Sequence, residues 1–182
     1  KTRQDQDEPF FAFVSFPDPH HPFNPPGKYW DMYSPDDFDI TLPYAANRNP
    51  TPPLKWLYDN WKGAGEQLTP QTAMMLDDQQ IKEAMALSAG MMTFVDDAIG
   101  DVMQGLQDAG LYEDTVVCFN SDHGDYMGDY NMILKGALQY RSITQVPFIW
   151  SDPDTRRSGA TDALCSTVDI AATILDRAGL AP

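Results

Sequence analysis

The sequence predicts a layered α/β domain, and three observations support that prediction. The segments 10–16, 115–120 and 146–150 are short, apolar and rich in aromatic or β-branched residues, as buried strands are. The segments 79–109 and 166–178 repeat apolar residues at helical spacing. The 182 residues, 42% hydrophobic and 21% charged, have the size and composition of a chain with a packed core. We therefore expect one domain, or most of one.

The first predicted strand opens the N-terminal half of the chain. Residues 1–8 are polar and are interpreted as a connector. The run 10–16 suits a strand covered on both faces, as in parallel sheets, and Pro17-Asp18-Pro19 ends it. Residues 22–78 are rich in Pro and aromatic side chains, which indicates a long excursion stiffened by proline.

The remaining elements alternate between helical and strand patterns. Gly110 supplies the stop of the helix 79–109, and the β-branched run 115–120 follows it. Pro147 places the strand 146–150 near a strand start or at a sheet edge. The helix 166–178 ends before Gly179. The residues expected to face inward are Ala84, Leu87, Met91, Phe94, Ala98, Val102 and Leu106 in the first helix and Val168, Ala171, Ala172 and Leu175 in the second.

The charge balance excludes some classes of partner. Twelve basic and 27 acidic side chains give a net charge of −15 and a pI near 4.2. A surface of that sign repels phosphate backbones and anionic membranes. In addition, no apolar run approaches the roughly 20 residues of a spanning helix. We expect a soluble protein with neither a nucleic acid nor a membrane as partner, and the sequence favours no particular compartment.

All three histidines follow predicted strands. His20 and His21 stand in Pro19-His20-His21-Pro22 after the first strand, and His123 stands in 121–125 after the second. Ligands of open α/β sheets collect beyond the carboxyl ends of the strands. The two segments are therefore the first places to look for a functional site.

Asp122 and His123 are the candidate metal ligands. A carboxylate and a neutral imidazole are both good donors to divalent ions, and adjacent residues of a loop can converge on one ion. The alternative is that Asp122 forms a turn before Gly124 while His123 is merely exposed. Two donors do not complete a site, so at least two more would have to come from elsewhere.

Lys135 and His20 are the candidate anion contacts. Lys135, in Leu134-Lys135-Gly136, can offer a point charge, and His20 can donate to an anionic oxygen or protonate a leaving group. The alternatives are a solvated surface lysine and a loop histidine packed against nearby aromatic side chains.

The order and spacing of these residues resemble the sulfatases of the alkaline phosphatase-like superfamily. Residues 13–23 resemble their Pro-His-x-Pro segment, and residues 115–136, which read TVVCFNSDHGDYMGDYNMILKG, are similar to the block that holds two metal ligands and a lysine. The segments 95–100, 106–111, 146–150 and 168–171 also look like landmarks of the family. The resemblance covers nearly the whole chain and is weakest at about 44–78.

The resemblance implies roles for individual residues. Asp122 and His123 become metal ligands, Lys135 and His20 contact the oxygens of a sulfate ester, and His20 can also protonate the departing alcohol. The implied ion is a divalent metal, with Ca²⁺ favoured and Mn²⁺, Mg²⁺ or Zn²⁺ open. Asp125, Asp129 and His21 have no firm counterpart in this scheme.

Two family features do not occur in the sequence. The Cys/Ser-x-Pro-Ser-Arg motif, whose first residue becomes the formylglycine nucleophile, is absent, and so is the Asp-Asp pair that supplies the other metal ligands. The chain is therefore interpreted as the C-terminal part of a sulfatase-type catalytic domain, with the nucleophile outside residues 1–182. We expect it to be inactive by itself.

Two alternatives to a sulfuric ester hydrolase stay open. Relatives with the same Asp-His block act on phosphate monoesters, phosphodiesters or phosphonates, and the fold can also serve a non-catalytic binding module. A partial sheet would expose apolar edges, so self-association into a homo-oligomer is a further expectation.

Overall fold

The structure is a computed structural model, and it describes residues 9–64, 69, 72–155 and 158–180. The predicted connector 1–8 lies outside these residues. Four α-helices and two strands organise the described part: α1 (Pro52–Ala64), α2 (Asp78–Asp108), β1 (Val117–Asn120), α3 (Arg141–Thr144), β2 (Phe148–Ser151) and α4 (Asp169–Arg177). Short 3₁₀ turns connect them. Helices together with a small sheet agree with the predicted α/β class.

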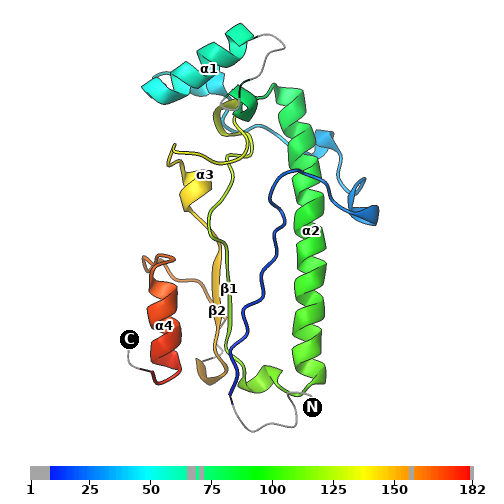
Figure 1. Cartoon of the computed structure of the whole chain (residues 1–182), viewed down its shortest axis with the longest axis vertical. Helices are drawn as coiled ribbons and strands as arrows, with labels where there is room; N and C mark the ends of the chain where they lie inside the picture. Colours follow the sequence, from blue (N-terminus) through cyan, green and yellow to red (C-terminus); the bar gives the residue numbers. More distant parts are fainter. Residues whose placement is uncertain (1–8, 65–68, 70–71, 156–157, 181–182) are drawn as a thin grey trace.

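Helix α2 runs along the long axis of the molecule (Figure 1). Asp77 caps its N-terminus by accepting a hydrogen bond from the Gln80 amide, and the Gln80 side chain accepts one from the Asp77 amide in return. Gly110, at φ 67°, follows its end. The buried side of α2 lies in its first half, where the buried residues are Ile81, Ala84, Ala86, Ser88, Ala89, Gly90 and Met91. The predicted helix is therefore confirmed to within one residue at each end, but its predicted inward face is buried only in part.

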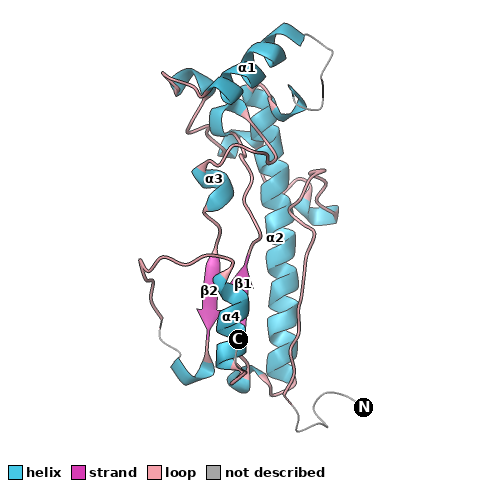
Figure 2. Ribbon diagram, turned by 60° about the vertical axis from the view of Figure 1, so that its left-hand side comes forward, coloured by secondary structure: helices cyan, strands magenta, loops and turns pink. Residues whose placement is uncertain are grey.

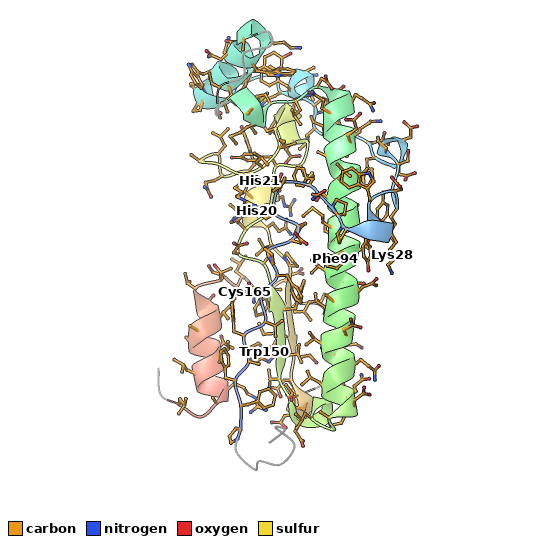
Figure 3. All side chains as sticks on the ribbon, turned by 45° about the vertical axis from the view of Figure 1, so that its right-hand side comes forward. His20, His21, Lys28, Phe94, Trp150 and Cys165 are labelled. Atoms are coloured by element: carbon orange, nitrogen blue, oxygen red, sulfur yellow. The ribbon has the colours of Figure 1, made fainter. Side chains whose placement is uncertain are left out.

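The two strands pair antiparallel, with Val117 opposite Ser151 and Asn120 opposite Phe148. Both lie inside or next to the predicted segments, and Pro147 immediately precedes β2. Figures 1 and 3 show this pair between α4 and α2. The parallel pairing expected from the sequence is not found among the described residues.

The predicted strand 10–16 is wrong. These residues are extended but join no ladder in the described part of the chain, and Phe13 is 83% exposed. An apolar strand is buried only where neighbouring strands and a covering layer meet it. In the described residues β1 and β2 pair with each other, so the segment has the composition of a buried strand without the partners.

Helix α4 forms where a helix was predicted, but its inward face was predicted wrongly. None of its residues is buried, and Val168, just before it, is 80% exposed. A bidentate ion pair connects α4 to the end of β2, because Arg177 donates to both oxygens of Asp152 at 2.6 and 3.0 Å. Arg177 also donates to Asp154 at 2.7 Å. Charge pairing, more than apolar burial, therefore holds this helix.

The core lies at the other end of the molecule, around α1 and the first turns of α2 (Figure 2). Helix α1 interrupts the proline-rich excursion, and it begins with Pro52-Pro53, which occupy helix positions that need no backbone donor. Leu54 of α1 packs in one cluster with Met75, Tyr126, Met132 and Ile143. This cluster supports the loop that follows β1. None of the described helices is long and apolar enough to cross a membrane.

The ion pair of Arg177 and Asp152 predicts a pH-dependent stability. The hydrogen bond from Arg177 lowers the pKa of Asp152 from its ordinary value to about 2. A carboxyl whose pKa is lower in the folded state stabilises the fold above its ordinary pKa of roughly 4, and this contribution is lost as the pH falls toward 2. Asp152→Asn should lower the thermal unfolding midpoint by a few degrees at pH 7 and flatten its dependence on pH between those values. Asp176→Asn, an exposed change on α4, is the control, and equal pH profiles for wild type and Asp152→Asn would refute the prediction.

Candidate functional site

The loop after β1 presents Asp122 and His123. Gly124 allows this loop to touch α3, because a Cβ there would lie 1.8 Å from the carbonyl oxygen of Ser142. The Gly124 amide donates to the Ile143 carbonyl at 2.9 Å. Any residue larger than glycine at position 124 would therefore push this loop, with Asp122 and His123, away from α3.

Asp122 and His123 direct one donor atom each toward the same space. Oδ2 of Asp122 lies 3.6 Å from Nε2 of His123, while Oδ1 accepts a hydrogen bond from the His123 amide at 2.8 Å. Nδ1 of His123 lies 2.8 Å from the Gly124 carbonyl, which can only accept, so Nδ1 carries the proton. In the neutral ring Nε2 therefore keeps its lone pair. Both side chains are accessible, at 84% for Asp122 and 40% for His123.

The electrostatics favour the ionised form of Asp122. Partial desolvation raises the pKa of this carboxyl, but the hydrogen bond from the His123 amide and the charge of His123 outweigh it, and the pKa lies below its ordinary value. A carboxylate beside an unprotonated imidazole nitrogen is a donor pair that suits a divalent cation.

The pair fits a metal ion as part of a ligand set. Adjacent donors about 3–4 Å apart can coordinate a common ion at the usual distances of about 2.0–2.6 Å. Among the described residues no group of three His, Cys, Asp or Glu side chains gathers in a way that could hold an ion. The described chain thus presents two donors of such a set.

His20 and His21 form a stacked pair, and Figure 3 shows them side by side. Their ring centroids are 4.0 Å apart, and Nδ1 of His20 donates to the His21 carbonyl at 2.6 Å. His20 is exposed, and its Nε2 is left to accept or donate elsewhere. His21 is half-buried, and its buried Nδ1 has no hydrogen-bond partner in the part of the chain that the structure describes. Desolvation, followed by the charges of His20 and Lys135, lowers the pKa of His21.

Lys135 is the electrostatic connection between the two histidine segments. Its charge acts on His21, and together with that of His123 it acts on Asp125. Burial raises the pKa of Asp125, and the main-chain amides of Met127 and Leu134, the charge of Lys135 and that of His123 when protonated oppose the rise. His20 and Lys135 thus act electrostatically on His21, Lys135 and His123 act on Asp125, and Asp122 adjoins His123.

Sequence reasoning assigned no firm role to Asp125 or His21. The available signal was proximity in the chain, since Asp125 follows His123 by two residues and His21 adjoins His20. A hollow of about 170 Å³ between β2 and α4 lies elsewhere and contains none of the predicted site residues. Trp150 and Cys165, which line it, are well separated from His20 and His21 in Figure 3.

Curated relatives match almost the whole chain. An arylsulfatase of Clostridium perfringens is 32% identical over 96% of this chain and 35% of its own length. The multifunctional alkaline phosphatase superfamily protein PehA of Trinickia caryophylli is 28% identical over 94% of this chain and 34% of its own length. The chain thus spans about a third of the length of these relatives.

Solved structures confirm the predicted fold class. The phosphonate monoester hydrolase of Agrobacterium radiobacter superposes with a TM-score of 0.76 at 28% identity, over 98% of this chain and 36% of that protein. The corresponding enzyme of Silicibacter pomeroyi gives 0.71 at 25% identity, over 88% of this chain and 32% of that protein. The Sulfatase family model matches residues 2–180, and the chain belongs to the sulfatase family.

Proposed function

We propose that this chain supplies one part of the catalytic centre of a sulfuric ester hydrolase. The observation that carries the proposal is an Asp-His donor pair, with a lysine whose charge acts on both His21 and Asp125, in a chain of the sulfatase family. The substrate is a sulfate ester. Its alcohol part would be shaped by the excursion 22–78 and by residues outside this chain.

Each residue has a distinct role in the proposal. Asp122 and His123 hold a divalent cation, for which Ca²⁺ is favoured and Mn²⁺, Mg²⁺ and Zn²⁺ are alternatives. When bound, the cation would supply Lewis-acid stabilisation of negative charge. Lys135 contributes an ammonium to the ester oxygens. His20, whose Nδ1 proton is already committed to the His21 carbonyl, presents Nε2 to donate a proton to the departing alcohol.

The proposal places the formylglycine nucleophile in a segment outside residues 1–182. With two metal donors in its described part, the chain by itself should bind the cation weakly and turn over no sulfate ester.

Phosphonate monoester hydrolysis is the second candidate. It is favoured by the two solved structures, which are both phosphonate monoester hydrolases and superpose on most of this chain. A bound cation and a lysine would stabilise the negative charge of a phosphorus ester as they would that of a sulfate ester. Hydrolysis of a chromogenic aryl sulfate and of a chromogenic phenylphosphonate monoester by the complete gene product separates the two. Turnover of neither would favour a binding module.

If Asp122 and His123 bind the cation, substitution of either residue should reduce the amount of bound metal. Asp122→Ala and His123→Ala should each remove most of the divalent metal from the complete gene product, because either change leaves one donor of the pair. Elemental analysis of the purified variants measures this directly. Asp96→Ala, on an exposed position of α2, is the matched control. Unchanged metal content in both site variants would exclude Asp122 and His123 as ligands.

Removal of the Lys135 ammonium should weaken stabilisation of the transition state. Lys135→Ala should lower kcat/KM for the sulfate ester about 100- to 1,000-fold, as removal of a single charge-stabilising donor does. Lys55→Ala removes an exposed lysine that pairs with Asp59 on α1, and it should leave kcat/KM unchanged. His20→Gln should slow substrates with poor leaving groups more than those with good ones. A Lys135→Ala protein with wild-type kinetics would contradict the role of Lys135.

Exposed apolar side chains predict self-association of the 182-residue chain. Phe11, Phe13 and Val14 of the N-terminal segment and Ile149 of β2 are exposed. Apolar surface next to an open strand edge favours pairing with another copy. Analytical ultracentrifugation should show an apparent mass that rises with concentration. A monomer at every concentration would refute this expectation.

A further inference from the structure

The loop between the proposed metal ligands, Asp122 and His123, and Lys135 contains several non-glycine residues with positive φ. In the described residues every non-glycine residue with positive φ lies here: Met127 at 38°, Tyr130 at 55°, Asn131 at 64° and Leu134 at 67°. A side chain with a Cβ disfavours this region, most of all where the residue is bulky. Such conformations persist only where surrounding contacts impose them, and they concentrate at functional sites. The contacts that impose them here can be identified.

Residues 131–133 of the loop are bound by segments outside it. The side chain of Asn131 accepts from the Tyr44 amide at 2.8 Å and donates to Asp78 at 2.8 Å and to the Leu76 carbonyl at 3.3 Å. The Ile133 amide donates to the Met74 carbonyl at 2.9 Å. These bonds fix residues 131–133 to the start of α2 and to the excursion.

The two ends of the loop, residues 125–127 and residue 134, meet at a place that we call its neck, and Asp125 lies there. Its Oδ1 accepts a hydrogen bond from the Met127 amide at 2.9 Å, and the main-chain amide of Leu134 also lowers the pKa of its carboxyl. The Tyr126 amide donates to the Leu134 carbonyl at 2.8 Å. The carbonyl of Leu134 is thus held by Tyr126, and its amide acts on Asp125, while the residue adopts a φ of 67°. The next residue is Lys135, so the conformation of Leu134 sets the direction in which Lys135 leaves the main chain.

Asp125 also lies between the two parts of the proposed site in the sequence, two residues after His123 and ten before Lys135. The groups whose charges act on it are Lys135 and His123. It is half-buried, so solvent competes only in part for its oxygens. One side chain therefore interacts both with Met127, near the start of the loop, and with Leu134, the residue before Lys135.

We propose that Asp125 is a positioning residue for Lys135, which it holds toward the ester by closing the neck of the 125–135 loop. The inference rests on the proposed function of Lys135, but the closure of the neck can be tested separately. Asp125 itself need not touch the substrate. A purely structural role would make it contribute to stability without acting through Lys135.

A double-mutant cycle in the complete gene product distinguishes these roles. Asp125→Ala should lower kcat/KM about 10- to 100-fold, the effect typical of residues that orient a functional group. Asp125→Asn retains one acceptor oxygen and should lie between Asp125→Ala and wild type. In a Lys135→Ala background, removal of Asp125 should cost nothing further, because the group that it positions is already absent. Losses that multiply in the double variant would overturn the proposal.

Asp129→Asn is the matched control for this cycle. Asp129 lies in the same loop, and among the described residues its carboxylate accepts none of the amide hydrogen bonds that close the neck. Its substitution should leave kcat/KM within about twofold of wild type. An effect as large as that of Asp125→Asn would overturn the assignment to Asp125.

Amide hydrogen exchange tests the neck without activity. Asp125→Ala, which removes both acceptor oxygens, should speed exchange at Leu134 and Met127 and leave Asn131, whose amide donates to the Gly128 carbonyl, unchanged. Unaltered exchange at Leu134 overturns the proposal. If Lys135→Ala keeps wild-type kinetics, or the gene product hydrolyses no ester, the proposed function fails, and the exchange result alone decides whether Asp125 closes the loop.

Discussion

The buried side chain of Asn131 joins the segments that surround the candidate site. Its amide group bonds to the excursion through Tyr44 and to the start of α2 through Leu76 and Asp78. The buried side chain of Asn131 would lose these partners if the loop moved, and an unpaired buried polar group is costly. The apolar cluster of Leu54, Met75, Tyr126, Met132 and Ile143 packs around the same place. The loop can hold four residues at positive φ because hydrogen bonds and apolar packing act there together.

This arrangement separates a rigid part of the molecule from a weakly packed one. The loop of the site lies over the core near α1 and the first turns of α2. The antiparallel strand pair, the segment 10–16 and α4 expose apolar side chains and depend on contacts such as the Arg177–Asp152 ion pair. Two strands are fewer than a stable sheet generally needs. The site residues are thus supported by the better packed part, although β1 introduces them.

Most elements could be located from local patterns. Periodicity placed α2 within one residue at each end, and composition placed β1, β2 and α4, because the local conformational preferences of these segments agree with their final state. Composition did not reveal that 10–16 lacks strand partners or that α4 buries no residue, since both depend on what lies next to them. It also missed α1, because the density of prolines in the excursion concealed that Pro52 and Pro53 occupy a helix start.

The candidate site divides in the same way. The sequence by itself determined the chemical types, namely an adjacent Asp-His pair, a lysine twelve residues after His123 and a histidine between prolines, together with the resemblance to the sulfatase family. Tertiary structure decided that the charge of Lys135 acts on His21 and Asp125, that Nδ1 of His123 donates to the Gly124 carbonyl, and that Asp125 accepts a hydrogen bond from the Met127 amide. The physical reason is that residue type and spacing are properties of the chain, whereas hydrogen-bond partners and positive φ values are imposed by segments that meet only in the folded molecule.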